Sequence, residues 1–142
     1  MNTKRLYVPP KPEALKYNDD GLNVTLKITR ANGESGTYRT LLMEQAREQE
    51  NGKDIGNDLR RLGNYLTHLF VYPSLIAAVD EAQGFAEWPL SFEDYLKLPE
   101  AFLMAWEAKV WELNPHWQPK APGEEQAQSE ADQKKAPGSA QG

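Results

Sequence analysis

Residues 22–29 read LNVTLKIT, an alternation of apolar and polar side chains. Successive side chains of a β-strand point to opposite faces, so an alternation of this kind is typical of a strand with one buried face. The apolar set that would share the buried face comprises Leu22, Val24, Leu26 and Ile28. We therefore expect a half-buried strand here, with the rest of the fold arranged around its apolar side.

A turn is expected directly after this strand. Residues 31–36 read ANGESG, in which the Asn32-Gly33 pair and Gly36 tolerate positive backbone angles. Residues 37–40 would then return as a second short strand. The pattern thus predicts a β-hairpin built from residues 22–28 and 37–40.

The residues before the strand favour an extended arm. Pro9, Pro10 and Pro12 have a fixed backbone angle and lack the amide donor that a helix needs. We expect residues 1–20 to form a proline-rich arm, which is either mobile or clamped onto the body or a partner.

Helix-forming residues dominate from residue 41. A first helix is expected over residues 41–50 and ends at Asn51-Gly52. Asp54 would cap a longer helix with one apolar stripe, formed by Ile55, Leu59, Leu62, Leu66 and Leu69. Gly63 lies inside this helix and costs about 1 kcal/mol relative to alanine. Its expected use is to let another helix approach closely.

Proline and glycine divide the next part of the chain. Pro73 must start a new helical segment or kink the previous one, and the buried face is expected to continue to Val79. A loop over residues 84–89 holds Phe85 and Trp88, which should lie over the edge of the core.

Two further helices complete the predicted body. Ser91 opens a short helix in capping-box style, with Leu90 placed as a hydrophobic staple. The last helix is expected over residues 101–113 and ends at Asn114-Pro115. It is apolar on most sides, as in a helix that is central in the core or shared with a partner.

The aromatic residues of this region are the candidate partner-binding residues, because tryptophan is enriched in protein interfaces. Packing in the core is the alternative for each of them. An inward stripe of Phe102, Trp106, Val110 and Leu113 would leave Trp111 and Trp117 exposed. The predicted partner-binding set is Trp111, Trp117, Phe102, Trp106 and Trp88.

These elements predict a mainly α fold, in which a short N-terminal β-hairpin is followed by a small helical bundle within residues 21–117. Residues 118–142 carry alanine as their only hydrophobic residue type. Such a segment cannot bury enough apolar surface to fold, so a disordered tail or linker is expected.

Composition excludes several functional classes. The chain has 142 residues, enough for one domain, and a net charge of -5, which argues against nucleic-acid binding. It has 0 Cys, so it has neither a disulfide framework nor a cysteine nucleophile. The longest apolar stretch, residues 69–79, is interrupted at Tyr72-Pro73 and is too short for a membrane span. We expect a cytoplasmic protein that contacts neither nucleic acid nor membrane.

No arrangement of catalytic or metal-ligating residues stands out. His68 and His116 are far apart and lack partners at metal-ligand spacing, so His68 is interpreted as a partly buried, hydrogen-bonded histidine. Acidic pairs such as Glu44 and Glu48 fit ordinary helix surfaces. The sequence predicts a protein that is not an enzyme and has no metal and no cofactor.

Two segments carry a resemblance to a known family. Residues 90–102 read LSFEDYLKLPEAF and residues 105–117 read AWEAKVWELNPHW. Together with the order hairpin, helices and polar tail, residues 22–117 resemble the tail assembly chaperones of long-tailed bacteriophages and prophages.

The resemblance implies a non-enzymatic protein that binds the tape measure protein and tail tube subunits in the bacterial host cell while the tail assembles. In that family a frameshift often appends a second domain through a flexible linker, a role that residues 118–142 would suit. The alternative is a structural virion component, such as a small tail or head-tail connector protein. Self-association into a homo-oligomer remains open. A DNA-binding regulator is disfavoured by the acidic charge.

Overall fold

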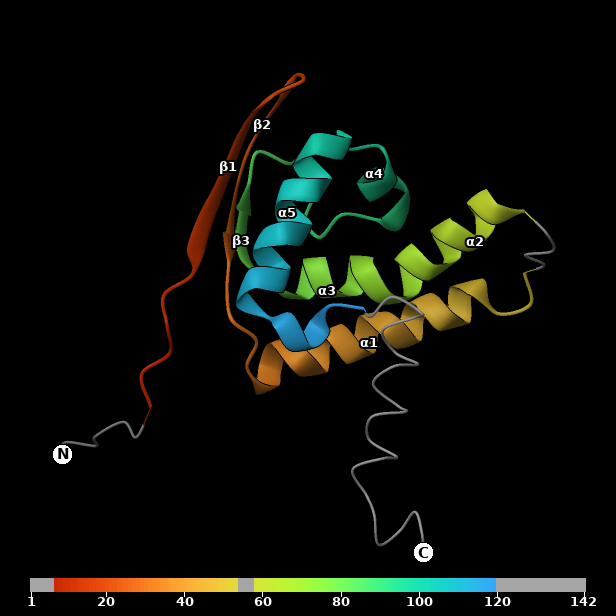
Figure 1. Ribbon diagram of the computed structural model, residues 1–142, viewed down its shortest axis with the longest axis horizontal. Helices are drawn as coiled ribbons and strands as arrows, with labels where there is room; N and C mark the ends of the chain where they lie inside the picture. The colour runs from red at the N-terminus through yellow and green to blue at the C-terminus, as the bar shows by residue number, and fades with distance from the viewer. Residues whose placement is uncertain (1–6, 54–57, 120–142) are drawn as a thin grey trace, which may run out of the picture.

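The computed structural model describes residues 7–53 and 58–119. A sheet and a set of helices pack around one core (Figure 1). The strands are β1 (Glu13–Asp19), β2 (Leu22–Ile28) and β3 (Val79–Gln83). The helices are α1 (Gly33–Glu50), α2 (Leu59–Leu66), the π-helical turn η1 (Thr67–Val71), α3 (Tyr72–Ala77), α4 (Phe92–Leu96), α5 (Glu100–Leu113) and the 3-10 turn η2 (Pro115–Trp117).

The three strands form an antiparallel sheet in the order β1-β2-β3. Leu15 lies opposite Leu26, and Tyr17 lies opposite Val24, so the apolar side chains of β1 and β2 share one face. The turn between these strands is Asp20-Gly21, with φ angles of 56° and 76°. Two consecutive positive φ angles match the twist of a two-residue hairpin.

The prediction of a mainly helical fold is wrong. β2 is a strand as expected, but its hairpin partner is β1 rather than residues 37–40, which belong to α1. The expected continuation of a helix to Val79 is replaced by β3, which pairs with the other edge of β2. The sheet therefore has three strands, and β1 comes from residues assigned to the proline-rich arm. Residues 7–12 are exposed and precede it.

The start of α1 explains why the second predicted strand is absent. The side chain of Asn32 accepts a hydrogen bond from the Ser35 amide at 2.9 Å. In return, Ser35 Oγ accepts one from the Asn32 amide at 2.8 Å. This capping box makes Asn32-Gly33 a helix start instead of a hairpin turn. The predicted end is confirmed, because Asn51 is the C-cap and Gly52 follows with a φ of 84°.

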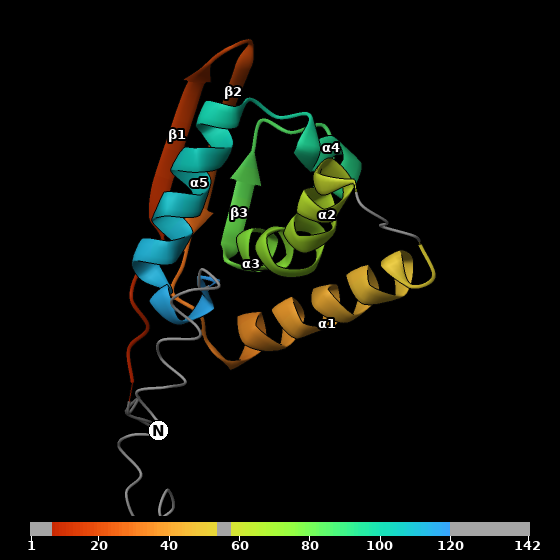
Figure 2. The ribbon, with the colours of Figure 1, turned by 45° about the vertical axis from the view of Figure 1, so that its right-hand side comes forward.

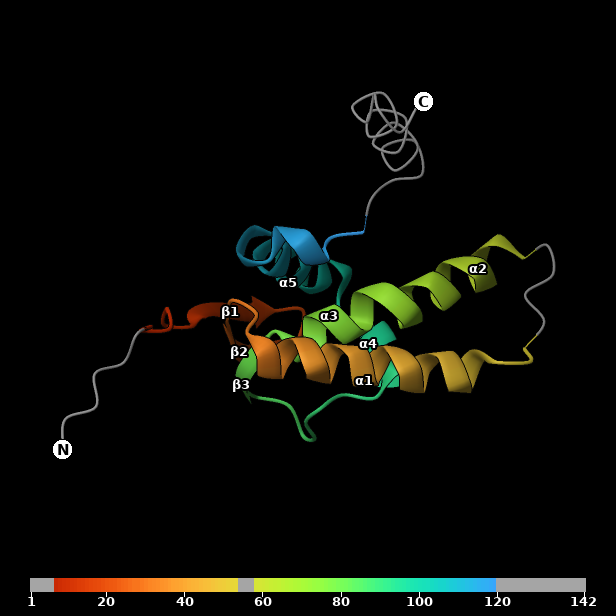
Figure 3. The ribbon, with the colours of Figure 1, turned by 90° about the horizontal axis from the view of Figure 1, so that it is seen from below.

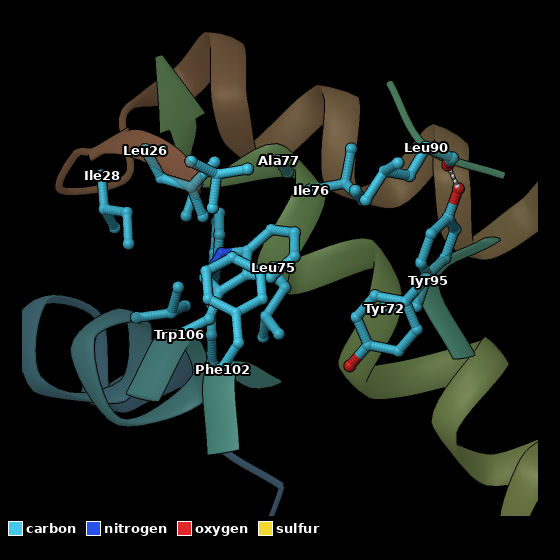
Figure 4. Close-up of a cluster of buried hydrophobic side chains, with 14 of the residues drawn as sticks. Leu26, Ile28, Tyr72, Leu75, Ile76, Ala77, Leu90, Tyr95, Phe102 and Trp106 are labelled. Carbon is cyan, nitrogen blue, oxygen red and sulfur yellow. Dashed lines mark hydrogen bonds between the residues drawn. The ribbon is translucent and has the colours of Figure 1, made fainter. Parts of the chain in front are cut away.

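α5 contributes four side chains to the core. Its predicted inward stripe is confirmed, since Phe102, Trp106, Val110 and Leu113 are all buried. Figure 2 shows α5 lying along the sheet, and in Figure 3 α3 lies between α5 and α1. Side chains of the sheet, α3, α4 and α5 meet in the cluster of Figure 4. At its centre, Trp106 Nε1 has no hydrogen-bond partner among the described residues.

The start of α4 has the predicted serine cap. Ser91 caps α4 by accepting a hydrogen bond from the Asp94 amide at 3.1 Å. The hydroxyl of Tyr72 donates to the Leu90 carbonyl, which fixes the preceding loop to α3. Phe85 and Trp88 are half-buried against the core, as expected for residues at its edge. Pro73 stands in the first turn of α3, directly after η1.

Three distant parts of the chain meet at the end of β2. The Thr29 amide donates to the Ala78 carbonyl at 2.9 Å. Asn114, which is fully buried, accepts from the Ala31 amide at 2.6 Å and donates to the Thr29 carbonyl at 3.1 Å. One side chain at the end of α5 therefore satisfies both backbone groups where the chain leaves the sheet for α1.

Replacing this side chain should destabilise the whole fold. Asn114→Ala leaves the Ala31 amide and the Thr29 carbonyl unpaired, at an expected cost of about 2–3 kcal/mol in the free energy of unfolding. Urea unfolding followed by tryptophan fluorescence measures this loss. Asn18→Ala, at an exposed position of β1, is the matched control and should change stability little. A similar effect for both variants would contradict the role assigned to Asn114.

Gly84 is a second position at which the backbone restricts the residue type. Its φ is 99°, and an added Cβ would lie 2.3 Å from the Asn23 carbonyl oxygen. Gly84→Ala should therefore cost at least about 2 kcal/mol through strain and displacement of β2. Gly36→Ala is the control, because a Cβ there meets nothing within 4 Å and alanine favours the helix. Thermal unfolding should rank Gly36→Ala above the parent protein and Gly84→Ala below it.

Candidate protein-binding surface

Four large apolar side chains on one side of α2 and η1 keep more than a third of their surface exposed. Leu59 is 80% exposed, Leu62 38%, Leu66 44% and Phe70 39%. Their spacing of three or four residues places them on a single stripe. We call these four residues the α2 face. Single exposed apolar residues are ordinary, whereas a contiguous set of this kind is a candidate for a protein-interaction surface.

α2 is positioned by its own cap and by the helices that follow it. The side chain of Asp58 accepts hydrogen bonds from the Arg60 and Arg61 amides at 3.0 and 3.4 Å. The helix then runs through η1 into α3, which is buried. Figures 1 and 3 show α2 extending away from the body alongside the C-terminal half of α1, while α3 stays inside the body. The predicted cap Asp54 and stripe member Ile55 lie outside the described residues.

The sequence located this stripe but not its environment. Leu69 is buried in the body, whereas the three leucines of α2 remain exposed. Gly63 was expected to allow close approach of another helix. A Cβ at Gly63 would meet nothing within 4 Å, so the described chain supplies no such helix. Gly63 is itself exposed and stands between Leu62 and Leu66 in the helix.

The predicted partner-binding aromatic residues are mostly inside the molecule. Phe102 and Trp106 belong to the core and are closed to any partner without unfolding. Trp88 is half-buried, with its ring 6.1 Å from that of Trp106. The expected exposure of Trp117 is wrong, because it is 6% exposed. Arg39 lies over its ring, 4.9 Å from the centroid, in a cation–π contact.

Trp111 is, with Trp88, one of the two predicted residues that keep partial access to solvent. Its ring is half-buried, and Glu107 stands on the preceding turn of α5. Burial raises the pKa of the Glu107 carboxyl, while the nearby Trp111 side chain acts in the opposite direction. Met104 on the outer side of the same helix is exposed. The outer side of α5 therefore also presents apolar side chains to solvent.

A polar pair of side chains lies where α1 meets η1. His68 is buried, and its Nδ1 lies 2.7 Å from Glu50 Oε2. The ring stacks on Phe92 at 4.1 Å between centroids. Glu50 comes from a different helix, so spacing in the sequence gave no signal for this pair.

A cavity of about 130 Å³ opens beside His68. Its lining comes from α1, the η1–α3 segment and the start of α4 and consists of Leu42, Gln45, Ala46, Gln49, His68, Tyr72, Ser91, Phe92 and Glu93. Burial raises the pKa of Tyr72 to about 12, so its phenol stays neutral and hydrogen-bonded. Ser91 Oγ is used as the cap of α4. The pair of His68 and Glu50 therefore stands as a structural link between α1 and η1.

Residues 7–53 and 58–119 contain no group of three or more side chains placed to hold a metal ion. In the same part of the chain, no helix combines the length and the apolar character needed to cross a membrane.

Comparison of the chain with protein-family models, with curated protein sequences and with solved structures finds no match. The resemblance to tail assembly chaperones therefore stays a prediction.

If the α2 face is free in the isolated protein, polar substitutions there should leave folding intact. Leu59→Gln combined with Leu66→Gln keeps strong helix formers and removes exposed apolar surface, so we expect a loss of at most about 1 kcal/mol. The matched control is Leu75→Ala in buried α3, which should cost about 2–5 kcal/mol. Urea unfolding compares them. Equal losses would mean that the α2 face is part of the core.

Proposed function

We propose that the chain is a non-enzymatic tail assembly chaperone of a bacteriophage or prophage. It binds the tape measure protein and tail tube subunits in the cytoplasm of the bacterial host while the tail assembles. The observation that carries the proposal is the α2 face, an exposed apolar stripe on a helix that extends beyond the body. A chaperone needs such a surface to cover apolar segments of a partner before assembly.

The distribution of charge and apolar surface supports the same proposal. A net charge of -5 keeps the free protein and its complexes dispersed and disfavours nucleic acid as a partner. The outer side of α5, with Met104 and half-buried Trp111, adds a second contact area. Of the five predicted partner-binding residues, Trp111 is the one retained here. The buried aromatic residues act by holding α5 in place.

Affinity purification from cells that produce the whole gene cluster tests the proposal. The tagged full-length chain should recover the tape measure or tail tube protein and should be absent from finished particles, as measured by mass spectrometry. The variant Leu59→Gln with Leu66→Gln is the matched control, since it should fold yet recover much less partner. Recovery that is equal for both proteins would show that the α2 face is not the binding surface.

The alternative function, a structural virion component, predicts a different outcome of the same experiment. The chain would then occur in purified particles in a fixed ratio to the tail proteins. Finding neither a tail protein in the complex nor the chain in particles would overturn both functions.

A further inference from the structure

The glycine in the middle of α2 has no structural reason in the described chain. Gly63 has ordinary helical geometry, and a Cβ added to it meets nothing within 4 Å. Glycine disfavours a helix relative to alanine, so the fold itself would be more stable with a side chain here. Gly33 and Gly36 also have open space, but they lie at the start of α1.

The position of Gly63 suggests what the missing side chain permits. On a helix, residue 63 lies one turn from Leu59 and Leu66 and next to Leu62, so it falls among the residues of the α2 face. The distance between two packed helices depends on the side chains at their point of contact. A notch surrounded by exposed leucines is thus a surface into which a second helix can pack closely.

The charge of α2 indicates which side chains a partner helix would carry. α2 reads LRRLGNYL, with Arg60 and Arg61 in its first turn and no acidic residue. Cations near a helix N-terminus are disfavoured by the helix dipole, and the carboxylate of Asp58 is already used as the cap. Arg60 is exposed, and within the described residues no ion pair involves it. The border of the α2 face therefore complements negative charge.

We propose that the α2 face binds an amphipathic helix of another protein, which crosses α2 at Gly63 and carries acidic residues that pair with Arg60. This inference rests on the proposed function and specifies the partner segment of the same surface. A second copy of the chain fits less well, because its α2 would bring two arginines and no carboxylate in either orientation. Residues 120–142 offer only alanines as hydrophobic residues and cannot fill a leucine-lined notch.

Two designed peptides and the full-length chain test the inference. Each peptide has about 20 residues, long enough to become helical when bound, and carries the same leucine stripe. One has glutamates on both sides of the stripe and the other has lysines. Fluorescence anisotropy should show that the acidic peptide binds at least about tenfold more tightly, with an advantage that shrinks as salt is added. Arg60→Gln should reduce the difference between the peptides.

Gly63→Ala distinguishes close helix packing at residue 63 from non-specific hydrophobic binding. The added methyl group should raise or preserve the melting temperature and weaken binding of the acidic peptide about tenfold. Gly36→Ala is the matched control, since it also fills open space in a helix but lies away from the α2 face, and it should bind like the parent.

Each remaining outcome overturns the inference. Equal binding of both peptides would exclude the acidic border, and unchanged binding by Gly63→Ala would exclude close crossing at the glycine. No binding of either peptide would exclude a helix as the occupant. Dimerisation in analytical ultracentrifugation that is lost in Leu59→Gln with Leu66→Gln would assign the surface to a second copy. The peptides are independent of any phage protein, so these results are distinct from failure to recover a tape measure protein.

Discussion

The structure depends on the position of β2 between two other strands. Its apolar side chains Val24, Leu26 and Ile28 are buried, and its two edges pair with β1 and β3. Because β3 directly follows α3, pairing along β2 also brings the buried helix α3 next to the sheet. α5 then closes the apolar face, and Asn114 at its end bonds to the backbone just beyond β2. Both other strands and the end of α5 thus bond to this one strand or to the residues just beyond it.

The sequence predicted the parts of this arrangement that local patterns determine. The alternation in β2, the cap at Ser91, the end of α1 and the inward stripe of α5 all depend on residues close in the chain. β1 was missed because the prolines at positions 9, 10 and 12 favoured an extended arm over residues 1–20. The Asp20-Gly21 turn that follows β1 was therefore not interpreted as a hairpin turn. β3 reads VDEAQ, which has little strand preference, and becomes a strand because the edge of β2 is open to it. Tertiary pairing of this kind leaves no local signal.

The candidate surface was predicted in a similar, partial way. Helical spacing identified the leucines of α2 as one stripe, but spacing alone does not tell whether another helix covers that stripe. The same limit applies to the aromatic residues, because composition marks tryptophan as a favoured interface residue while packing decides its exposure. Trp117 is buried because the chain turns back at η2 and places its ring beneath Arg39. The contact between His68 and Glu50 joins separate helices, so spacing along the chain could not predict it.

The body of the molecule and α2 differ in whether their residues stabilise the isolated chain. In the body, apolar side chains are buried and most buried polar groups of the described chain are paired, with Trp106 Nε1 as an exception. Three features of the α2 sequence lower the stability of the isolated helix. Leucines are exposed to water, arginines occupy the first turn and a glycine stands in the middle. Each feature becomes favourable in the complex that we propose. An acidic amphipathic helix on the α2 face would cover the leucines, pair with Arg60 and contact α2 closely at Gly63. The exposed leucines, the arginines and the glycine of α2 are thus explained together by the helix partner that we propose.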